Sequence, residues 1–155
     1  MKKHASLPAA LALALAIPGA AIAAPARAQP HDCRVRVEHA WVRWLPAGLP
    51  MGGYMSLHNG GTRTVALTGA RSTGFDGVML HRSMRRGGLD TMQPVAAVSI
   101  PAGGTVRFAP GGYHLMLMGA AATVQPGARV RIELQFAGCA PQSVLFRVRD
   151  AGGRP

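Results

Sequence analysis

The sequence has few acidic residues, few aromatic residues and only two cysteines. Its 155 residues include 6 Asp and Glu against 17 Lys and Arg, and aromatic side chains make up 5% of the chain. With so few carboxylates, neither paired carboxylates nor a Ser/His/Asp set stands out, so we do not expect an enzyme. No Cys-x-x-Cys motif occurs, and a thioredoxin-like redox role therefore has no support.

Long apolar runs are also missing, except for one at the N-terminus. Two lysines precede an Ala- and Leu-rich run over residues 7–22, and Ala-x-Ala patterns end at Ala23 and Ala28. This arrangement predicts a cleavable signal peptide over residues 1–28, with cleavage after Ala23 as the alternative. No lipobox leads into Cys33. We therefore expect a periplasmic protein without a stable membrane anchor.

Removal of this leader changes the charge of the chain. Lys2, Lys3 and Arg27 leave with it and no acid does, so the net charge falls from +11 to +8. Many of the remaining arginines occupy the outward positions of predicted strands, where charge opposes edge-to-edge association. Export also argues against nucleic acid as a partner.

Helical periodicity is absent from the mature chain, and turn residues are abundant. Gly and Pro supply 28 of its 127 residues, and apolar and polar residues alternate with a period of two. The pattern predicts one all-β domain over residues 33–150, a Greek-key β-barrel or sandwich of about seven to nine strands. The candidate strands are 34–37, 54–58, 64–70, 78–84, 95–100, 105–109, 113–118, 129–136 and 144–149.

The two cysteines, Cys33 and Cys139, lie near opposite ends of this domain. An oxidising compartment permits a disulfide between them, which would close a long loop and stabilise the fold by about 4–5 kcal/mol in the chain-entropy model. Two unpaired thiols are the alternative, because sequence alone does not show that they are close.

Methionine and histidine are unusually frequent, with seven Met and five His after the leader. His114 and Met116 share one face of a predicted strand, because side chains two residues apart point the same way. A turn at Gly87-Gly88 would bring Met92 back toward His81. Two imidazoles and two thioethers form a neutral, soft ligand set, which suits Cu(I) and not Zn²⁺, Mg²⁺ or Ca²⁺.

The spacing His81–x10–Met92–x21–His114–x–Met116 resembles the signature of the periplasmic copper chaperones of the PCu(A)C family. Further similar segments extend the resemblance over roughly residues 35–149. They are Ala40-Trp41-Val42-Arg43, Gly53-Tyr54-Met55, Leu57-His58-Asn59-Gly60, Ile100-Pro101-Ala102-Gly103-Gly104 and the run from Pro110 to Gly119.

The resemblance implies a cupredoxin-like β-barrel that binds Cu(I) and has no enzymatic turnover. His81 and His114 would each donate a ring nitrogen, and Met92 and Met116 would each donate sulfur. The expected partners are copper-donating or copper-accepting periplasmic proteins, such as cytochrome oxidase subunit II or its assembly factor, during assembly of the copper A centre. We expect the carrier to be a monomer.

In one position the chain departs from the family pattern. The family often carries an acidic residue after its first ligand His, whereas Arg82 follows His81 here, with Arg85 and Arg86 nearby. The added positive charge should lower the affinity for a cation and favour an acidic partner surface.

Two other functions fit the same sequence. A periplasmic copper-buffering or resistance protein would use the same site without donating the ion. A secreted β-sandwich interaction module would carry its His and Met residues incidentally.

The remaining His, Met and Trp residues are assigned to packing or left without a role. Met118 shares the face of His114 and Met116, but we expect it to be a core residue. The other methionines could each supply a second soft ligand, but core or surface packing is favoured for them: Met51, Met55, Met79 and Met84. Trp41 and Trp44 are expected in the core or the site wall, and His39 and His58 lack a partner pattern.

Overall fold

The computed structural model describes residues 33–46 and 48–152, and these form ten strands and no helix. The strands are β1 (Val35–Arg43), β2 (Met51–Asn59), β3 (Val65–Arg71), β4 (Phe75–Arg86), β5 (Leu89–Pro94), β6 (Val98–Ile100), β7 (Thr105–Phe108), β8 (Tyr113–Ala120), β9 (Arg129–Phe136) and β10 (Gln142–Arg149). The predicted all-β fold is confirmed. The predicted leader, residues 1–28, lies outside the described residues, and the described part contains no helix suited to crossing a membrane.

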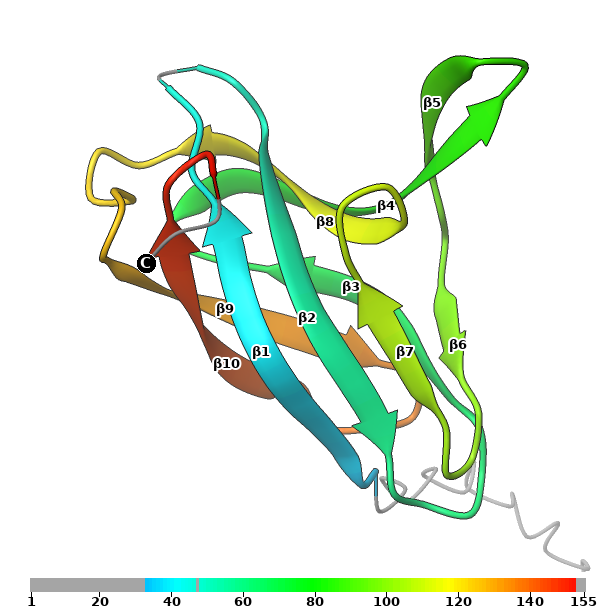
Figure 1. Cartoon of the computed structure of the whole chain (residues 1–155). Helices are drawn as coiled ribbons and strands as arrows, with labels where there is room; N and C mark the ends of the chain where they lie inside the picture. Colours follow the sequence, from blue (N-terminus) through cyan, green and yellow to red (C-terminus); the bar gives the residue numbers. More distant parts are fainter. Residues whose placement is uncertain (1–32, 47, 153–155) are drawn as a thin grey trace, which may run out of the picture.

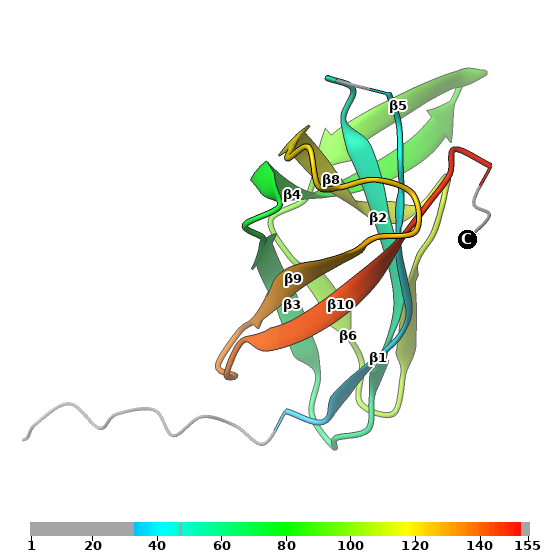
Figure 2. The ribbon, with the colours of Figure 1, turned by 90° about the vertical axis from the view of Figure 1, so that its left-hand side faces the viewer.

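The strands form one continuous sheet that folds over itself. Its order is β5-β4-β8-β7-β2-β1-β10-β9-β3-β6, with a further pairing between β8 and β2. β1, β2 and β7 form a front wall, with β3 and β9 behind it (Figure 1). In Figure 2, the side view, β3 and β9 lie to the left of β1 and β2. Between them lie buried aliphatic and aromatic side chains, including Leu57, Leu115, Ile132 and Phe146.

The sequence pattern does not predict β5. It is short and exposed along its described length, and its sequence lacks the apolar alternation of a half-buried strand. It forms because β4 continues past the barrel, pairs with it from His81 to Arg86, and turns at Gly87-Gly88. Both glycines have positive φ, as a tight two-residue hairpin turn requires. The hairpin of β4 and β5 projects from the body in Figure 1.

A β-bulge in β1 determines which of its side chains face the core. The register with β2 shifts between Glu38 and Trp41, and His39 has a φ of 54°. Val37 pairs with Leu57 before the bulge, whereas Val42 pairs with Gly53 after it. The extra residue therefore turns Val42 into the core and places Trp41 on the outer face.

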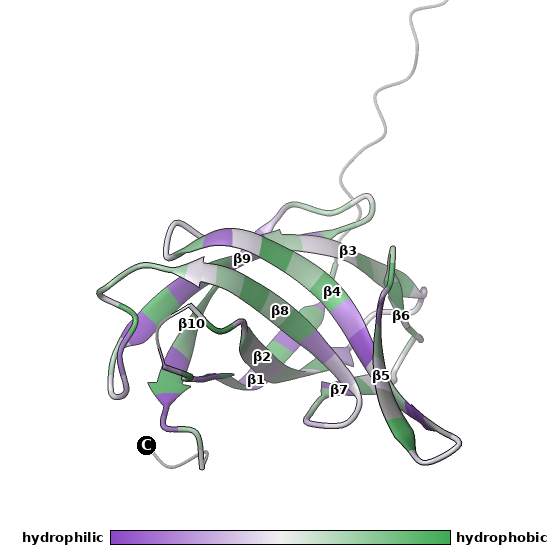
Figure 3. Cartoon of the chain, turned by 90° about the horizontal axis from the view of Figure 1, so that it is seen from above, coloured by the Kyte–Doolittle hydropathy of each residue, from purple (hydrophilic) through white to green (hydrophobic). Residues whose placement is uncertain are grey.

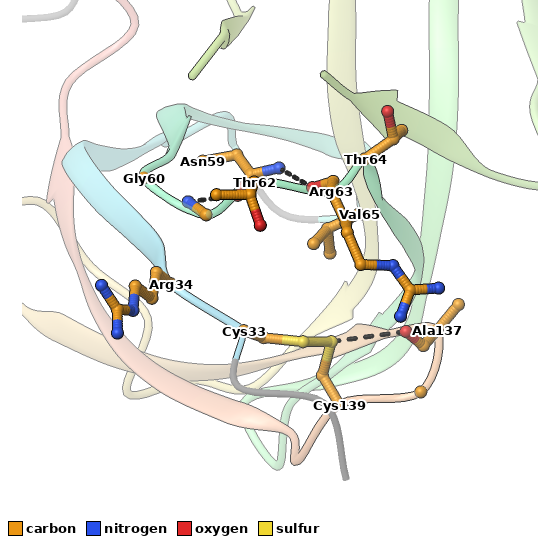
Figure 4. Close-up of a pocket in the computed structure, with 12 residues that line it drawn as sticks. Cys33, Arg34, Asn59, Gly60, Thr62, Arg63, Thr64, Val65, Ala137 and Cys139 are labelled. Carbon is orange, nitrogen blue, oxygen red and sulfur yellow. Dashed lines mark hydrogen bonds between the residues drawn. A yellow bond between two sulfur atoms is a disulfide. The ribbon is translucent and has the colours of Figure 1, made fainter. Parts of the chain in front are cut away.

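Cys33 and Cys139 form a disulfide; their Cα atoms are 5.9 Å apart, and their sequence separation is 106. It joins the chain just before β1 to the turn that follows β9 (Figure 4). The bond borders a surface hollow of about 640 Å³, which is also lined by Arg34 and the turn that follows Asn59. Asn59 holds this turn: it donates to the carbonyls of Arg63 and Ile100 and accepts from the amide of Gly61.

The double variant Cys33→Ser/Cys139→Ser should lose about 2–5 kcal/mol of unfolding free energy, because the bridge limits the unfolded chain over a long loop. Urea denaturation with and without reductant measures this. The reductant should lower the midpoint of the wild-type protein and leave the variant unchanged. An identical midpoint for oxidised wild type and variant would contradict the stabilising role.

Candidate metal centre

Two histidines face each other across the central strand pair of the site. His81 in β4 lies directly opposite His114 in β8, so both side chains point to the same face of the sheet. Their ring centroids are 5.8 Å apart with planes at 63°, and the residues are 9% and 6% exposed. β4 and β8 run side by side with β5 rising at their end (Figure 3). Two imidazoles at this separation can share one ion.

A backbone hydrogen bond orients His114. Its Nδ1 lies 3.1 Å from the carbonyl oxygen of Gly112, which can only accept, so Nδ1 carries the proton. Nε2 then keeps a free lone pair, the form in which imidazole binds a metal. The same carbonyl accepts from the amide of Ser83 at 3.0 Å. One oxygen therefore ties together the start of β8 and the base of the projecting hairpin.

The ring of His81, unlike that of His114, is not oriented by a hydrogen bond at Nδ1. Its Nδ1 is buried and has no hydrogen-bond partner. Burial lowers the pKa of His81 below its ordinary value of 6.5, and the nearby His114 lowers this pKa further. Both effects favour the neutral imidazole. A metal ion would satisfy a buried ring nitrogen that the protein itself leaves unpaired, so the donor set fits a soft cation.

The two predicted methionine ligands have different settings. Met116 is half-buried, two residues from His114 on the same face of β8. Met92 lies opposite Ser83, two positions along β4 from His81, and is 62% exposed. The structure therefore brings His81, His114 and Met116 together on adjoining strands. The β4–β5 hairpin carries Met92 to their border.

An aromatic wall adjoins the site on the side of β2. Gly52 lies opposite Met116, and a Cβ at Gly52 would come within 2.5 Å of the Tyr54 hydroxyl oxygen, so the tyrosine ring lies across this glycine. Trp41 packs on Tyr54 with ring centroids 4.6 Å apart. Burial raises the pKa of Tyr54, and the charge of Arg43 opposes this rise. The wall therefore lies over the residue of β2 that pairs with Met116.

Met118 does not belong to the core, contrary to the expectation from sequence. It is 41% exposed, because β8 directs Leu115 and Leu117 inward and its even-numbered residues outward. Met51 and Met55 are buried in the core as expected.

The other sequence candidates lie apart from the site or on its margin. Among the described residues, no three His, Cys, Asp or Glu side chains gather as a metal-binding group. His39 lies in the β1 bulge, His58 is hydrogen-bonded to Thr105, Trp44 packs against the core, and Met84 is half-buried in the hairpin.

The fold and this His/Met cluster define a class of protein, the PCuAC-type β-domain. A structure named "Copper-bound PCuAC domain from PmoF2" has a TM-score of 0.63 at 24% identity, covering 75% of this chain and 92% of that one, a likeness that shows the fold. Another, "Solution structure of CuI-DR1885 from Deinococcus Radiodurans", has a TM-score of 0.60 at 29% identity, covering 73% and 76%. The predicted resemblance to the PCu(A)C family and the cupredoxin-like fold are confirmed.

The sequence family is also established. The family model described as "Putative lipoprotein LpqE-like" matches residues 35–148, and the chain belongs to this LpqE-like family. A relative named "Putative lipoprotein Lxx21020", from Leifsonia xyli subsp. xyli, is 33% identical over 146 residues, covering 92% of this chain and 87% of the relative.

The metal-free protein should lose stability in mild acid because of His81. Its pKa is lower in the folded state than the value of 6.5 expected in the unfolded chain. The unfolded chain therefore takes up its proton first, and the unfolding free energy falls as the pH drops below about 6.5. Above about pH 6.5 this contribution is fully present.

Urea denaturation at about pH 7.5 and about pH 5.5 tests the assignment. His81→Gln should remove part of the wild-type loss between the two pH values, while His58→Gln, far from the site, serves as the matched control. The same acid-induced loss in His81→Gln and wild type would show that His81 does not cause it.

Proposed function

We propose that this protein is a periplasmic carrier of Cu(I), which it holds with His81, His114, Met92 and Met116. The observation that carries the proposal is the pair of buried, facing imidazoles, one of them with an unpartnered nitrogen, beside the Met116 thioether. All four donors are neutral, and thioethers are ligands of Cu(I). The titles of two similar structures, which name bound copper and bound Cu(I), support the same cargo.

The geometry suits a carrier that gives up its ion by ligand exchange, without catalytic turnover. His81, His114 and Met116 lie in the β4–β8 strand pair, whereas Met92 lies in the projecting hairpin and is the most exposed of the four. A partner's thiolate can therefore replace the Met92 thioether first, and the ion passes between proteins without being released to water. All four ligands belong to one chain, so we propose that the carrier acts as a monomer.

We propose further that the acceptor is the copper A centre of cytochrome oxidase, through subunit II or its assembly factor. This step rests on the family resemblance. The arginines around the hairpin, including the exposed Arg82 and Arg85, favour an acidic surface on such a partner.

The protein is proposed to be exported and free of a lipid anchor. The names of its family and of its relative refer to lipoproteins, which supports export. In this chain both cysteines are joined in the disulfide, so neither thiol remains to bind a lipid. Recovery in the osmotic-shock fraction of the source cells, and not with the membranes, tests this localisation.

Anaerobic titration of the mature domain with Cu(I), in competition with a chromogenic chelator, tests the cargo. The wild-type protein should bind one ion. Met92→Leu/Met116→Leu should weaken binding by more than about 100-fold, because two ligands are lost while side-chain volume and stability are nearly kept.

Met84→Leu is the control, since Met84 lies in the same hairpin on the opposite face from Ser83 and Met92. Equal affinity of the double variant would refute the ligand assignment. Absence of Cu(I) binding in the wild type would favour a metal-free interaction module.

Deletion of the gene should lower oxidase activity, and added copper should restore it, if the protein delivers copper. Oxidase activity and copper tolerance of the deletion strain are measured together. Unchanged oxidase activity with greater copper sensitivity would support the buffering function and overturn delivery.

A further inference from the structure

A third methionine lies next to the His/Met cluster and belongs to no part of the sequence motif. Met79 in β4 is the direct cross-strand partner of Met116 in β8. Its neighbours in β4, Val78 and Leu80, are directed toward the core, so Met79 shares the outer face with His81. At 42% exposure it is too open to be explained by core packing.

Met79 completes a compact block of four donor side chains on two strands. The pair His81–His114 and the pair Met79–Met116 are successive pairs on one face of the β4–β8 ladder. Directly opposed side chains in such a ladder have Cβ atoms about 4.5–5.5 Å apart, within reach of flexible thioethers that share one ion. Two imidazoles and two thioethers are thus available without β5.

Met92 lies on the other side of His81. It is opposite Ser83, in a third strand that pairs only with the end of β4, and its side chain is the most exposed of the four proposed ligands. Met79 precedes His81 by two residues and Ser83 follows it by two, so the two thioethers flank this histidine along β4.

We propose that Met79 is a reserve ligand, which takes the place of Met92 on Cu(I) when the hairpin opens toward a partner. In this exchange one Cu–S bond to Met92 breaks and one Cu–S bond to Met79 forms. No electron or proton moves, because both donors are neutral thioethers and copper stays Cu(I). The ion keeps two nitrogen and two sulfur ligands while Met92 is free, so the hairpin can move without loss of the cargo. This inference rests on the proposed Cu(I) carriage.

A double-mutant cycle on Cu(I) affinity tests the reserve role. Met79→Leu alone should change affinity little, and Met92→Leu alone should weaken it moderately. Met79→Leu/Met92→Leu should lose at least about tenfold more than the product of the two single effects, the size expected for coupled neighbours. Met118→Leu/Met92→Leu is the matched control, because Met118 shares the exposed face but lies opposite Gly77 and not opposite a proposed ligand. It should match Met92→Leu.

X-ray absorption of the Cu(I)-loaded variants gives a second readout. Two sulfur neighbours of copper should persist in Met92→Leu and fall to one in Met79→Leu/Met92→Leu. One sulfur in Met92→Leu already, together with multiplicative single effects, would overturn the reserve role and leave Cu(I) carriage intact. Failure of the carriage itself would be recognised separately, as absence of Cu(I) binding by the wild-type protein.

Discussion

The antiparallel register of β4 and β8 is the constraint on which the site depends. It sets His81 against His114 and Met79 against Met116, while Leu80 and Leu115 of the same strands meet in the core. A slip of β4 by one residue against β8 would turn His81 and Met79 inward and expose Leu80. The free-energy cost of exposing this leucine therefore protects the arrangement of the proposed ligands. The alternation of side chains along β4 and β8 thus places the leucines in the core and the proposed ligands on the outer face.

Several features around this strand pair distinguish a part of the site held within the barrel from a part carried by the projecting hairpin. The carbonyl of Gly112 accepts from His114 and from the amide of Ser83, which fixes the base of the hairpin. The Trp41–Tyr54 pair supports the side of β2. Beyond Ser83, β4 is paired only with β5, and Met92 is carried there. This division suits the proposed carrier, since such a protein must hold its ion and still present one replaceable ligand to a partner.

Much of the fold could be predicted from the sequence, because strand alternation and turn residues are local signals. The run from Arg129 to Phe136 alternates in the sequence and in the structure alike. β5 could not be predicted, because a solvent-exposed hairpin strand has no buried apolar face and so no apolar alternation in its sequence. The prediction that Met118 lies in the core was wrong. A methionine can occupy either face of a strand, and only the orientation of β8 against the core decides which face is buried. The β1 bulge was equally hidden, since the one-residue register shift at His39 is defined by the partner strand.

The sequence by itself determined the chemistry of the donors. Two imidazoles and two thioethers are soft and neutral in any arrangement, and His114 and Met116 share a face in any strand. Only the tertiary structure decided which donors meet, because the pairing of β4 with β8 joins residues more than thirty positions apart. It also decided that Cys33 bonds to Cys139 and that Met79 lies beside Met116. The kind of ligand is a property of single residues, whereas register is a property of two strands and the core that both of them cover.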